Sequence, residues 1–541
     1  MDLNVSTYKA IRNAATLFPE ENALLFLGKY VVYRDLIRKI DQVASGLSQM
    51  GIRQGDVITM AMPNILEAVY AFYAVSKLGA VGHMAHPTTP VKQMRRFMEK
   101  TGSKHIIVLD TFFNHYESLL DHTDIQMVLA SPVDEFGWVK KIGYRLINRK
   151  KLARIPWTQG NILRFGSLYR SADMAEQPTI DSKQTAVYLH SGGTSGEPKT
   201  IELSHYAINS LAEKLPFILG VDRVEGIHIL AVLPMFHGFG LCMGIHAMLM
   251  AGGTDTLMPK FDPGKTIELI KSNQVNIIIG IPSLFQSLLS HPSIAGQHLK
   301  NLRWAFVGGD IVNPDLKHRF ENTMASYRSS ARLLEGYGLT EVVTVCAVNL
   351  PADPSPKGVG RPLPGIEVAI IDTDSKAFLN PGEPGEIVVS GPTMMNGYLD
   401  DPDSNHQTFL IDDTGKSWVK TGDYGLIDPD GYLWFKQRLK RIVKVLGMPV
   451  LPAEIENLMT SLKEIKEAAA VGIPDPEKGF VIKLYLVEDP MSIAKPSDEI
   501  IKQMIKAEIS PYAVPKEIVF LPELPKTEIG KIDTRKLETM T

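Results

Sequence analysis

Cysteine is scarce in this sequence of 541 residues, and neither sign of charge is in excess. Its two cysteines, Cys242 and Cys346, cannot build a disulfide framework or a cysteine metal site, so we expect a reducing cytoplasm. Lys and Arg number 57 against 60 Asp and Glu, a formal net charge of −3. This balance gives no indication of a nucleic-acid partner. The opening Met-Asp-Leu-Asn-Val-Ser lacks the charged and apolar regions of a signal peptide.

One long run lacks charge altogether. Residues 226–254 contain no Asp, Glu, Lys or Arg, and a segment of that length could span a bilayer. Residues that interrupt an apolar helix argue against a span: Pro234, Gly238, Gly240, Gly252, Gly253, His228, His237 and His246. We therefore predict a buried strand, a loop and a buried helix.

Another stretch lacks charge of one sign. Residues 139–170 contain no Asp or Glu but carry Lys140, Lys141, Arg145, Arg149, Lys150, Lys151 and Arg154. Trp138, Ile142 and Ile147 could complete a basic amphipathic helix, which can make a weak peripheral contact with an anionic membrane. A solvated helix that covers a sheet is the more common structure for such a pattern, and both interpretations stay open.

The pattern along the chain predicts an α/β fold in several domains, because 541 residues are too many for one core. Over 23–130, and again from 185 to 334, short β-type runs alternate with helical stretches, as in parallel sheets. Residues 360–435 are dense in Gly, Pro and short β runs and predict a small antiparallel subdomain. An α+β pattern follows, so we place the domains at 1–439 and 440–541.

A loop of small residues follows the apolar run 185–189. It reads Ser191, Gly192, Gly193, Thr194, Ser195, Gly196, Glu197, Pro198 and Lys199. The glycines let backbone N–H groups turn inward, and the hydroxyls and the lysine add donors and positive charge, so the loop can wrap a phosphate chain. It differs from the Walker pattern, because two residues separate the last glycine from the lysine. The alternative is a plain surface turn.

Four further features carry chemistry later in the chain. Residues 336–341, Gly-Tyr-Gly-Leu-Thr-Glu, offer an aromatic face for a base and two oxygen ligands suited to Mg²⁺. Asp423 can accept both hydroxyls of a ribose, and Arg438 would reach the same sugar if a hairpin joins them. Residues 525–531 place Lys531 after a glycine turn. Each feature alone is common at a protein surface, whereas their joint order and spacing are specific.

Together these motifs resemble the acyl-adenylate-forming superfamily, which includes acyl-CoA synthetases, aryl-CoA ligases, luciferases and the adenylation domains of peptide synthetases. The resemblance extends from the Pro-Glu-Glu-Asn-Ala-Leu run at 19–24 to Lys531. It implies a large N-terminal domain of two α/β sheets plus a small β-barrel. It also implies a mobile α+β C-terminal domain.

The resemblance further implies ATP, Mg²⁺ and CoA as ligands and a role for individual residues. The implied catalytic residues are Lys199, Thr340, Glu341 and Lys531, and the implied metal contacts are Thr194 and Glu341. The implied nucleotide contacts are the loop 191–199, Gly309, Asp310, Glu335, Gly336, Tyr337, Thr340, Asp423 and Arg438. Lys440 matches the hinge, Lys444, Leu446 and Gly447 match the turn that meets the thiol, and Lys260 matches a position near the CoA phosphates.

The implied reaction joins a carboxylate to the α-phosphorus of ATP, expels pyrophosphate and then passes the acyl group to a thiol. Two anions must meet, which explains the need for Lys531, Lys199 and Mg²⁺ rather than a protein nucleophile. Two positions depart from the family pattern. Gly192 replaces a hydroxyl residue and removes one phosphate donor. Thr200 replaces a glycine after the loop lysine, and its Cβ disfavours a positive φ.

The resemblance places the acid pocket at residues 233–240, Leu-Pro-Met-Phe-His-Gly-Phe-Gly, with His237, Gly238, Phe239 and Gly240 as its lining. Residues 231–250 contain no acidic side chain, and a buried ammonium without a partner would be costly, which disfavours an amino acid. The two glycines would leave volume. Met235, Met243, Met248 and Met250 could line an apolar tunnel or only pack the core. We expect a medium- or long-chain fatty acid, with an aromatic acid as the second choice.

The acceptor is expected to be CoA, because no carrier-protein domain follows the last motif, although a separate carrier protein is an alternative. A catalytically weak nucleotide-binding relative is a further alternative. The joint presence of Glu341, Asp423, Arg438 and Lys531 favours an enzyme over such a relative. The sequence does not indicate the oligomeric state.

Overall fold

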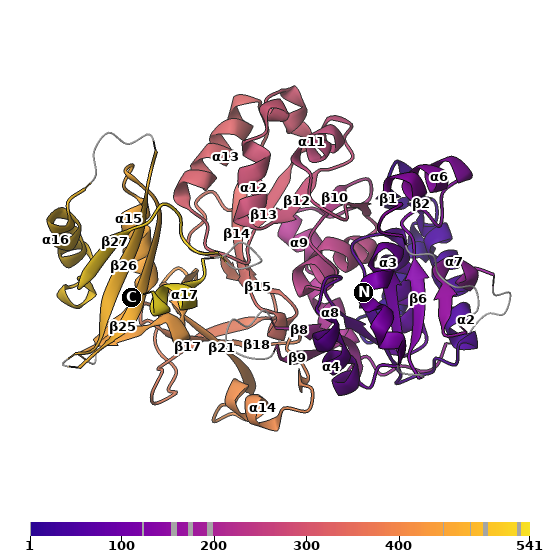
Figure 1. The fold of residues 1–541 in the computed structure, drawn as a ribbon, viewed down its shortest axis with the longest axis horizontal. Helices are drawn as coiled ribbons and strands as arrows, with labels where there is room; N and C mark the ends of the chain where they lie inside the picture. The colour runs from indigo at the N-terminus through magenta and orange to yellow at the C-terminus, as the bar shows by residue number, and fades with distance from the viewer. Residues whose placement is uncertain are drawn as a thin grey trace. The chain divides into compact units, whose positions relative to one another are not determined.

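The computed structural model describes residues 2–121, 124–152, 160–170, 177–191, 198–446, 448–476, 478–490, 496–526 and 532–540. The chain divides into two compact units. Unit 1 comprises Met1–Val368 and Val389–Val419, and unit 2 comprises Ala369–Val388 and Lys420–Thr541. Their helices and strands are labelled in Figure 1.

The first sheet of unit 1 has eight strands in the order β19-β9-β8-β4-β3-β5-β6-β7. Neighbours from β8 to β7 run parallel, whereas β8-β9 and β9-β19 are antiparallel. The strands are Val57–Ala61 (β3), Val81–Met84 (β4), His105–Leu109 (β5), Gln126–Ala130 (β6), Ile162–Arg164 (β7), Thr185–His190 (β8), Thr200–Ser204 (β9) and Gly397–Tyr398 (β19). Helix α3 (Leu66–Lys77) is buried along its whole length, as expected of a helix whose residues are mostly apolar.

The second sheet of unit 1 has nine strands in the order β16-β15-β14-β13-β12-β10-β11-β1-β2. Its strands are Asn22–Phe26 (β1), Lys29–Val32 (β2), His228–Ala231 (β10), Thr254–Leu257 (β11), Ile277–Gly280 (β12), Trp304–Val307 (β13), Leu333–Gly338 (β14), Val345–Val348 (β15) and Arg361–Pro362 (β16). Neighbours from β1 to β14 run parallel.

Three helices pack against the second sheet, as Figure 1 shows. They are Pro263–Lys271 (α11), Pro282–Leu289 (α12) and Pro314–Ser326 (α13). Their buried core includes Ile278, Phe285 and Phe320, and the two phenylalanine rings meet edge to face at 5.6 Å. The packed helices fix the strands, so the loops at the carboxyl ends of β10, β12, β13 and β14 meet at one edge of the sheet.

A third sheet contains Glu367–Ile371 (β17), Gly385–Ser390 (β18), Phe409–Ile411 (β20), Ser417–Ile427 (β21) and Leu433–Arg438 (β22). Its order is β17-β18-β21-β20, with β22 paired to β21, and its strands are divided between the two units. These strands form the small β-rich region that the Gly- and Pro-dense pattern predicted.

The last sheet lies within unit 2 and has the order β24-β23-β26-β25, with β27 paired to β26. Its strands are Val443–Val445 (β23), Met448–Val450 (β24), Ile465–Asp475 (β25), Gly479–Glu488 (β26) and Glu517–Phe520 (β27), and its helices are Pro452–Thr460 (α15), Asp498–Glu508 (α16) and Thr534–Thr539 (α17). The predicted α+β character of this region is confirmed. The hinge at Lys440 and the boundary at 439/440 stay predictions.

The uncharged run 226–254 forms buried structure, as predicted. It begins with β10, continues through a π-helix, Phe239–His246, and a short helix α10 (Ala247–Ala251), and ends at the start of β11. Within the described residues no helix is long and apolar enough to cross a membrane. The α/β fold class is likewise confirmed.

Candidate active site

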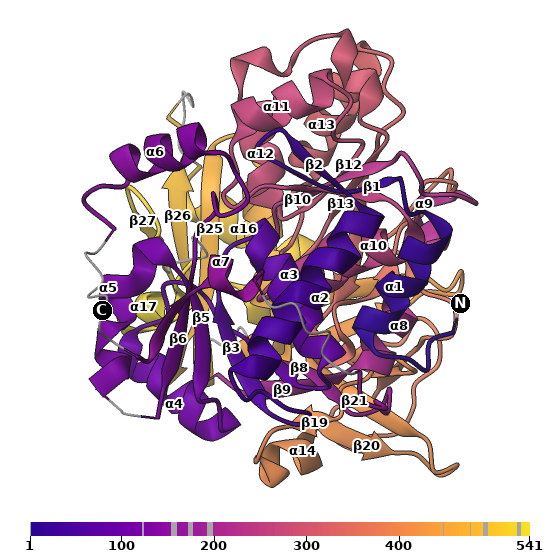
Figure 2. The same cartoon turned by 90° about the vertical axis from the view of Figure 1, so that its right-hand side faces the viewer.

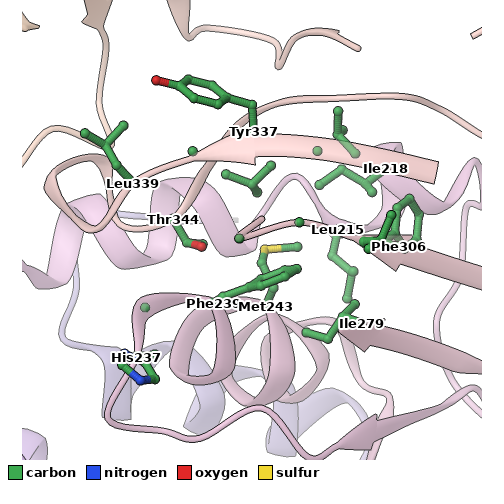
Figure 3. A pocket seen from close by; sticks show the side chains of 18 of the residues that line it. Leu215, Ile218, His237, Phe239, Met243, Ile279, Phe306, Tyr337, Leu339 and Thr344 are labelled. Atoms are coloured by element: carbon green, nitrogen blue, oxygen red, sulfur yellow. The ribbon is translucent and has the colours of Figure 1, made fainter. Parts of the chain in front are cut away.

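An apolar cavity opens at the carboxyl edge of the nine-stranded sheet, entirely within unit 1. Its volume is about 890 Å³, mouth included. Branched aliphatic side chains from α9 (Leu215–Leu219), β10 and β12 form one end, namely Leu215, Ile218, Leu219, Ile229, Ile277 and Ile279. Phe306, Gly308, Gly309 and residues 336–340 also line the cavity. Figure 3 shows Phe239 and Met243 on one side of the cavity, Tyr337 on the opposite side, and Phe306 beside Ile218.

The predicted acid-pocket segment contributes His237, Gly238 and Phe239 to the cavity. Burial, and to a smaller extent the nearby charge of His86, lowers the pKa of His237, so this imidazole is neutral at pH 7. Met243 also lines the cavity. Met235, Met248 and Met250 are buried and do not belong to its described lining, so these three methionines pack the core, the alternative to lining a tunnel.

The glycines of this segment permit close backbone approach rather than adding volume. A Cβ at Gly238 would overlap the Val343 carbonyl oxygen, and a Cβ at Gly240 would overlap the carbonyl oxygens of Leu233 and Pro234. The space beside each glycine is therefore already occupied by backbone. A π-helix begins at Phe239, and such wide turns are frequent at functional sites.

Val343 holds an unusual turn beside the cavity. Its φ is 68° and its ψ is −59°, and the Thr344 N–H donates to the Val342 carbonyl at 2.9 Å. This three-residue turn of positive φ is rare and strained, above all for a β-branched residue. The turn follows the predicted contacts Thr340 and Glu341, so strain is stored next to the site. Sequence reasoning missed it, because valine carries no signal for a positive φ.

Tyr398 joins two of the predicted catalytic residues. Its hydroxyl donates to Glu341 Oε1 at 2.9 Å, and the Lys199 ammonium lies 4.4 Å from the centre of its ring. Burial, with the Glu341 charge as the second cause, raises the pKa of Tyr398, so the phenol stays protonated and can donate. Sequence reasoning missed Tyr398, because β19 brings it to this place from more than fifty residues beyond Glu341.

The two ends of the glycine loop are joined at its base. The Ser191 N–H donates to the Lys199 carbonyl at 3.0 Å, and the Lys199 N–H donates to Ser191 Oγ at 3.1 Å. Thr200 pairs with His190 as the first residue of β9, an extended conformation that suits a residue with a Cβ. The predicted contacts Gly192, Gly193, Thr194, Ser195 and Gly196 lie outside the described residues.

A chain of buried hydrogen bonds holds the strand that enters this loop. Thr59 Oγ1 donates to Ser103 Oγ at 2.8 Å, so it must accept from His83 Nδ1 at 2.9 Å. His83 Nε2 then accepts from His190 Nε2 at 2.8 Å. Burial lowers the pKa of His190 to about 4, which keeps the imidazole neutral at pH 7. The loop therefore starts from a rigid anchor.

The remaining predicted nucleotide contacts fall at two places. Gly309 has a φ of 78° and lines the cavity together with Gly336, Tyr337 and Thr340. Asp310 follows at the exposed end of this turn. Glu335 is paired with Lys317 of α13 at 3.0 Å.

Asp423 and Arg438 lie opposite each other in unit 2. The strands β21 and β22 place them in register, and Arg438 Nε lies 3.0 Å from Asp423 Oδ1, with the carboxylate side chain 3% exposed. The predicted hairpin is confirmed. Lys440 and Lys444 are exposed, and Leu446 is 57% exposed with a φ of 51°. Lys260 is exposed in unit 1, whereas Gly447 and Lys531 lie outside the described residues.

A cavity at the carboxyl edge of a mostly parallel sheet is the usual place of ligand binding in α/β enzymes. The chain belongs to the AMP-binding enzyme family, whose model matches residues 11–399. A model of the C-terminal domain of these enzymes matches residues 454–531.

Relatives cover nearly the whole chain. The long-chain-fatty-acid–CoA ligase of Bacillus subtilis (strain 168) is 28% identical over 540 residues, covering 99% of this chain and 94% of that protein. A 4-coumarate–CoA ligase of Humulus lupulus is 30% identical over 517 residues, covering 93% and 88%. The crystal structure of ATP-bound MatB from Rhodopseudomonas palustris has a TM-score of 0.84 at 22% identity, covering 99% and 98%, and shows the fold.

Proposed function

We propose that this protein is an AMP-forming acyl-CoA ligase that activates a medium- or long-chain fatty acid with ATP and transfers it to CoA. The observation that carries the proposal is the apolar cavity next to Thr340. Among the described residues that line it, none carries a charge, so a neutral acyl tail fits and a charged one would lose its hydration without compensation. Its relatives that are named fatty-acid–CoA ligases agree with this assignment.

An aromatic acid is the second candidate. Phe239, Phe306 and Tyr337 line the cavity and could stack on an aryl ring. A relative of similar identity is named a 4-coumarate–CoA ligase. The aliphatic part of the cavity favours the fatty acid, because Ile218, Leu219, Ile229 and Ile277 offer apolar surface against which an alkyl chain can pack.

In the first half of the proposed reaction, a carboxylate oxygen attacks the α-phosphorus of ATP, and the bond from that phosphorus to the pyrophosphate oxygen breaks. Lys199 and Lys531 would offset the negative charge that gathers on the phosphoryl oxygens. Tyr398 would hold the Glu341 carboxylate and the Lys199 ammonium in place through the contacts described above.

Glu341 and Thr194 would hold Mg²⁺, which supplies Lewis-acid charge at the phosphates. The residues present fit this ion, because Mg²⁺ in nucleotide sites commonly takes one or two protein oxygens and completes its shell with phosphate and water. Glu341 keeps Oε2 for such a contact while Oε1 accepts from Tyr398.

In the second half, the CoA sulfur attacks the acyl carbon, the bond from that carbon to the AMP oxygen breaks, and the thiol proton passes to solvent. We propose that Lys440 acts as the hinge between the two halves, so that Lys531 leaves before the thiol arrives. Lys444, Leu446 and Gly447 would then meet the thiol, and Lys260 would lie near the CoA phosphates. Gly309, Asp310, Glu335, Gly336 and Tyr337 would bind adenine, and Asp423 with Arg438 would bind ribose.

A cytoplasmic location is part of the proposal. Both cysteines are buried free thiols, which suits a reducing compartment. ATP and CoA would be supplied there.

The test is production of AMP, pyrophosphate and acyl-CoA from ATP, Mg²⁺, CoA and a panel of fatty, aromatic and amino acids, with the products identified by mass. A thioester from fatty acids is the expected result, and one from aromatic acids alone would favour the second candidate. Acyl-AMP that accumulates despite CoA would indicate a carrier-protein acceptor. The absence of turnover with every acid would contradict the proposal.

A further inference from the structure

Helix α6 (Trp138–Ile147) displays its apolar side to solvent. Its exposed fractions are 74% for Trp138, 64% for Val139, 48% for Ile142, 68% for Leu146 and 85% for Ile147. None of its ten residues, all of which the structure describes, is buried. A surface helix of a globular protein normally turns such a stripe toward the core, so this orientation needs a cause.

Polar contacts on the inner side of α6 hold it in this orientation. The Tyr144 hydroxyl donates to Asp110 Oδ1 at 2.6 Å. Lys140 Nζ donates to the Leu27 carbonyl at 2.8 Å and lies 4.2 Å from the centre of the Phe136 ring. The helix is therefore attached to unit 1 by its polar side, which leaves the apolar side outward.

Four of the five exposed apolar residues form one continuous outer face, and Ile147 lies outside it at the end of the helix. At 100° per residue, Trp138, Val139, Ile142 and Leu146 fall within about 100° of arc, opposite Tyr144. Figure 2 shows α6 as an outlying helix beyond the strands β5 and β6 of the eight-stranded sheet. The face is thus a ridge rather than a groove, and a soft surface can surround it.

Basic residues flank this ridge. Arg145, Arg149 and Lys150 are exposed beside or just after α6, and residues 139–170 contain no Asp or Glu. Two copies of such a face would repel each other, whereas an anionic surface would attract both. Trp138 at the start of the helix suits the boundary between headgroups and acyl chains.

We infer that α6 docks the protein onto an anionic lipid bilayer, with Trp138, Val139, Ile142 and Leu146 inserted among the headgroups. The helix lies in the plane of the interface, as basic amphipathic helices do. The benefit of docking, though not docking itself, rests on the proposed function, because a fatty acid partitions into the same bilayer.

The test uses the full-length protein and sucrose-loaded vesicles, without ATP, acid or CoA. One vesicle set is phosphatidylcholine, and the other contains three parts in ten of phosphatidylglycerol. We expect the protein to sediment with the anionic vesicles and to be released by high salt, since each Lys or Arg near the surface strengthens binding by about fivefold. Tryptophan emission should shift to the blue on binding, and Trp138→Phe should remove the shift.

The decisive variant is Val139→Ser with Leu146→Ser. It should weaken partitioning into anionic vesicles by roughly 10- to 100-fold, because two apolar side chains no longer leave water. The matched control is Ile411→Ser with Ile500→Ser, which removes two side chains that are 60% and 52% exposed elsewhere and should not change binding. Arg149→Glu with Lys150→Glu should weaken binding by roughly 25-fold or more.

Three results would overturn the inference: no binding to anionic vesicles, binding that the α6 variant leaves intact, or a solution dimer that the α6 variant dissolves. The dimer would assign the face to a second copy of the chain. Ligase activity on a medium-chain fatty acid is measured separately, in the absence of vesicles. Vesicle binding without ligase activity would contradict the proposed function but not the docking of α6. Ligase activity without vesicle binding would contradict the docking of α6 but not the proposed function.

Discussion

At the scale of single residues, Tyr398 offers the sharpest test of the site. Its hydroxyl holds Glu341 and its ring lies under the Lys199 ammonium, so Tyr398→Phe removes one contact and keeps the other. A hydrogen bond to a charged group contributes about 1.5–3 kcal/mol. We therefore expect roughly a tenfold or larger rise in the Mg²⁺ concentration needed for half-maximal adenylation.

The control for Tyr398 is Tyr30→Phe, which deletes a hydroxyl that accepts from Gln274 at 2.8 Å on the exposed part of unit 1. This variant should leave the Mg²⁺ dependence unchanged. If Tyr398→Phe lowers only the melting temperature, with an unchanged Mg²⁺ dependence, Tyr398 has a structural role alone.

The burial of Asp134 leads to a prediction about how the stability of the protein depends on pH. Burial raises the pKa of Asp134 to about 6, above the roughly 3.9 of an unfolded chain. Between these values the folded state binds a proton that the unfolded state releases, so stability falls as pH rises from about 4 to 6 and stays lower above 6. Asp134→Asn cannot titrate and should stabilise the protein by about 1–3 kcal/mol at pH 8.

Melting temperatures of the wild type and of Asp134→Asn, measured at pH 4.5 and pH 8, test whether ionised Asp134 lowers the stability. The variant should melt higher at pH 8 and nearly with the wild type at pH 4.5. Asp124→Asn, at a side chain that is 62% exposed, serves as the control and should show no such difference. A variant that is less stable at pH 8 would contradict the prediction.

At the scale of elements, the π-helix depends on Gly240. A Cβ there would overlap two backbone carbonyl oxygens, whereas a Cβ at Gly244 of the same helix would meet the Ile279 side chain at an ordinary 3.5 Å. Gly240→Ala must therefore move backbone, and we expect a loss of about 3 kcal/mol or more. Gly244→Ala should be neutral or slightly stabilising, since alanine favours helices.

Thermal unfolding of the two glycine variants separates steric overlap from a general effect of glycine loss. Equal destabilisation of both would show that flexibility, rather than close approach of the backbone, explains Gly240. The acid preference of Gly244→Ala should match the wild type, because Gly244 is not among the described residues that line the cavity.

At the scale of the whole molecule, the proposed alternation of two half-reactions predicts a selective defect. Lys531→Ala should slow acyl-AMP formation by roughly 10²–10³-fold, the usual effect of losing a preorganised charge donor. Thioester formation from added acyl-AMP and CoA should be retained, because Lys531 would have left the site by then. Rapid-quench assays of each half-reaction measure both rates.

The matched control is Lys526→Ala, a nearby lysine that pairs with Glu467 at 2.8 Å on the surface of unit 2. It should leave both half-reactions unchanged. Equal loss of both half-reactions in Lys531→Ala would argue against the alternation and against the hinge at Lys440.

Much of the fold and part of the site could be predicted from local pattern. The alternation of β and helical runs predicts parallel sheets, and the spacing of Asp423 and Arg438 predicts the hairpin that pairs them. Tyr398 and Val343 could not be found this way. Tyr398 meets Glu341 only because β19 pairs with β9, and Val343 adopts a positive φ that its residue type disfavours.

The sequence by itself determined the elements, the order of the motifs and the chemistry that each motif can perform, because periodicity, turn residues and side-chain charge act over short distances along the chain. Tertiary structure alone decided which of these residues meet and which way α6 faces. The pattern of apolar and basic residues in α6 is compatible with either side of the helix packing inward. The polar side faces inward because it binds Asp110 and the Leu27 carbonyl, which lie far from α6 in the sequence.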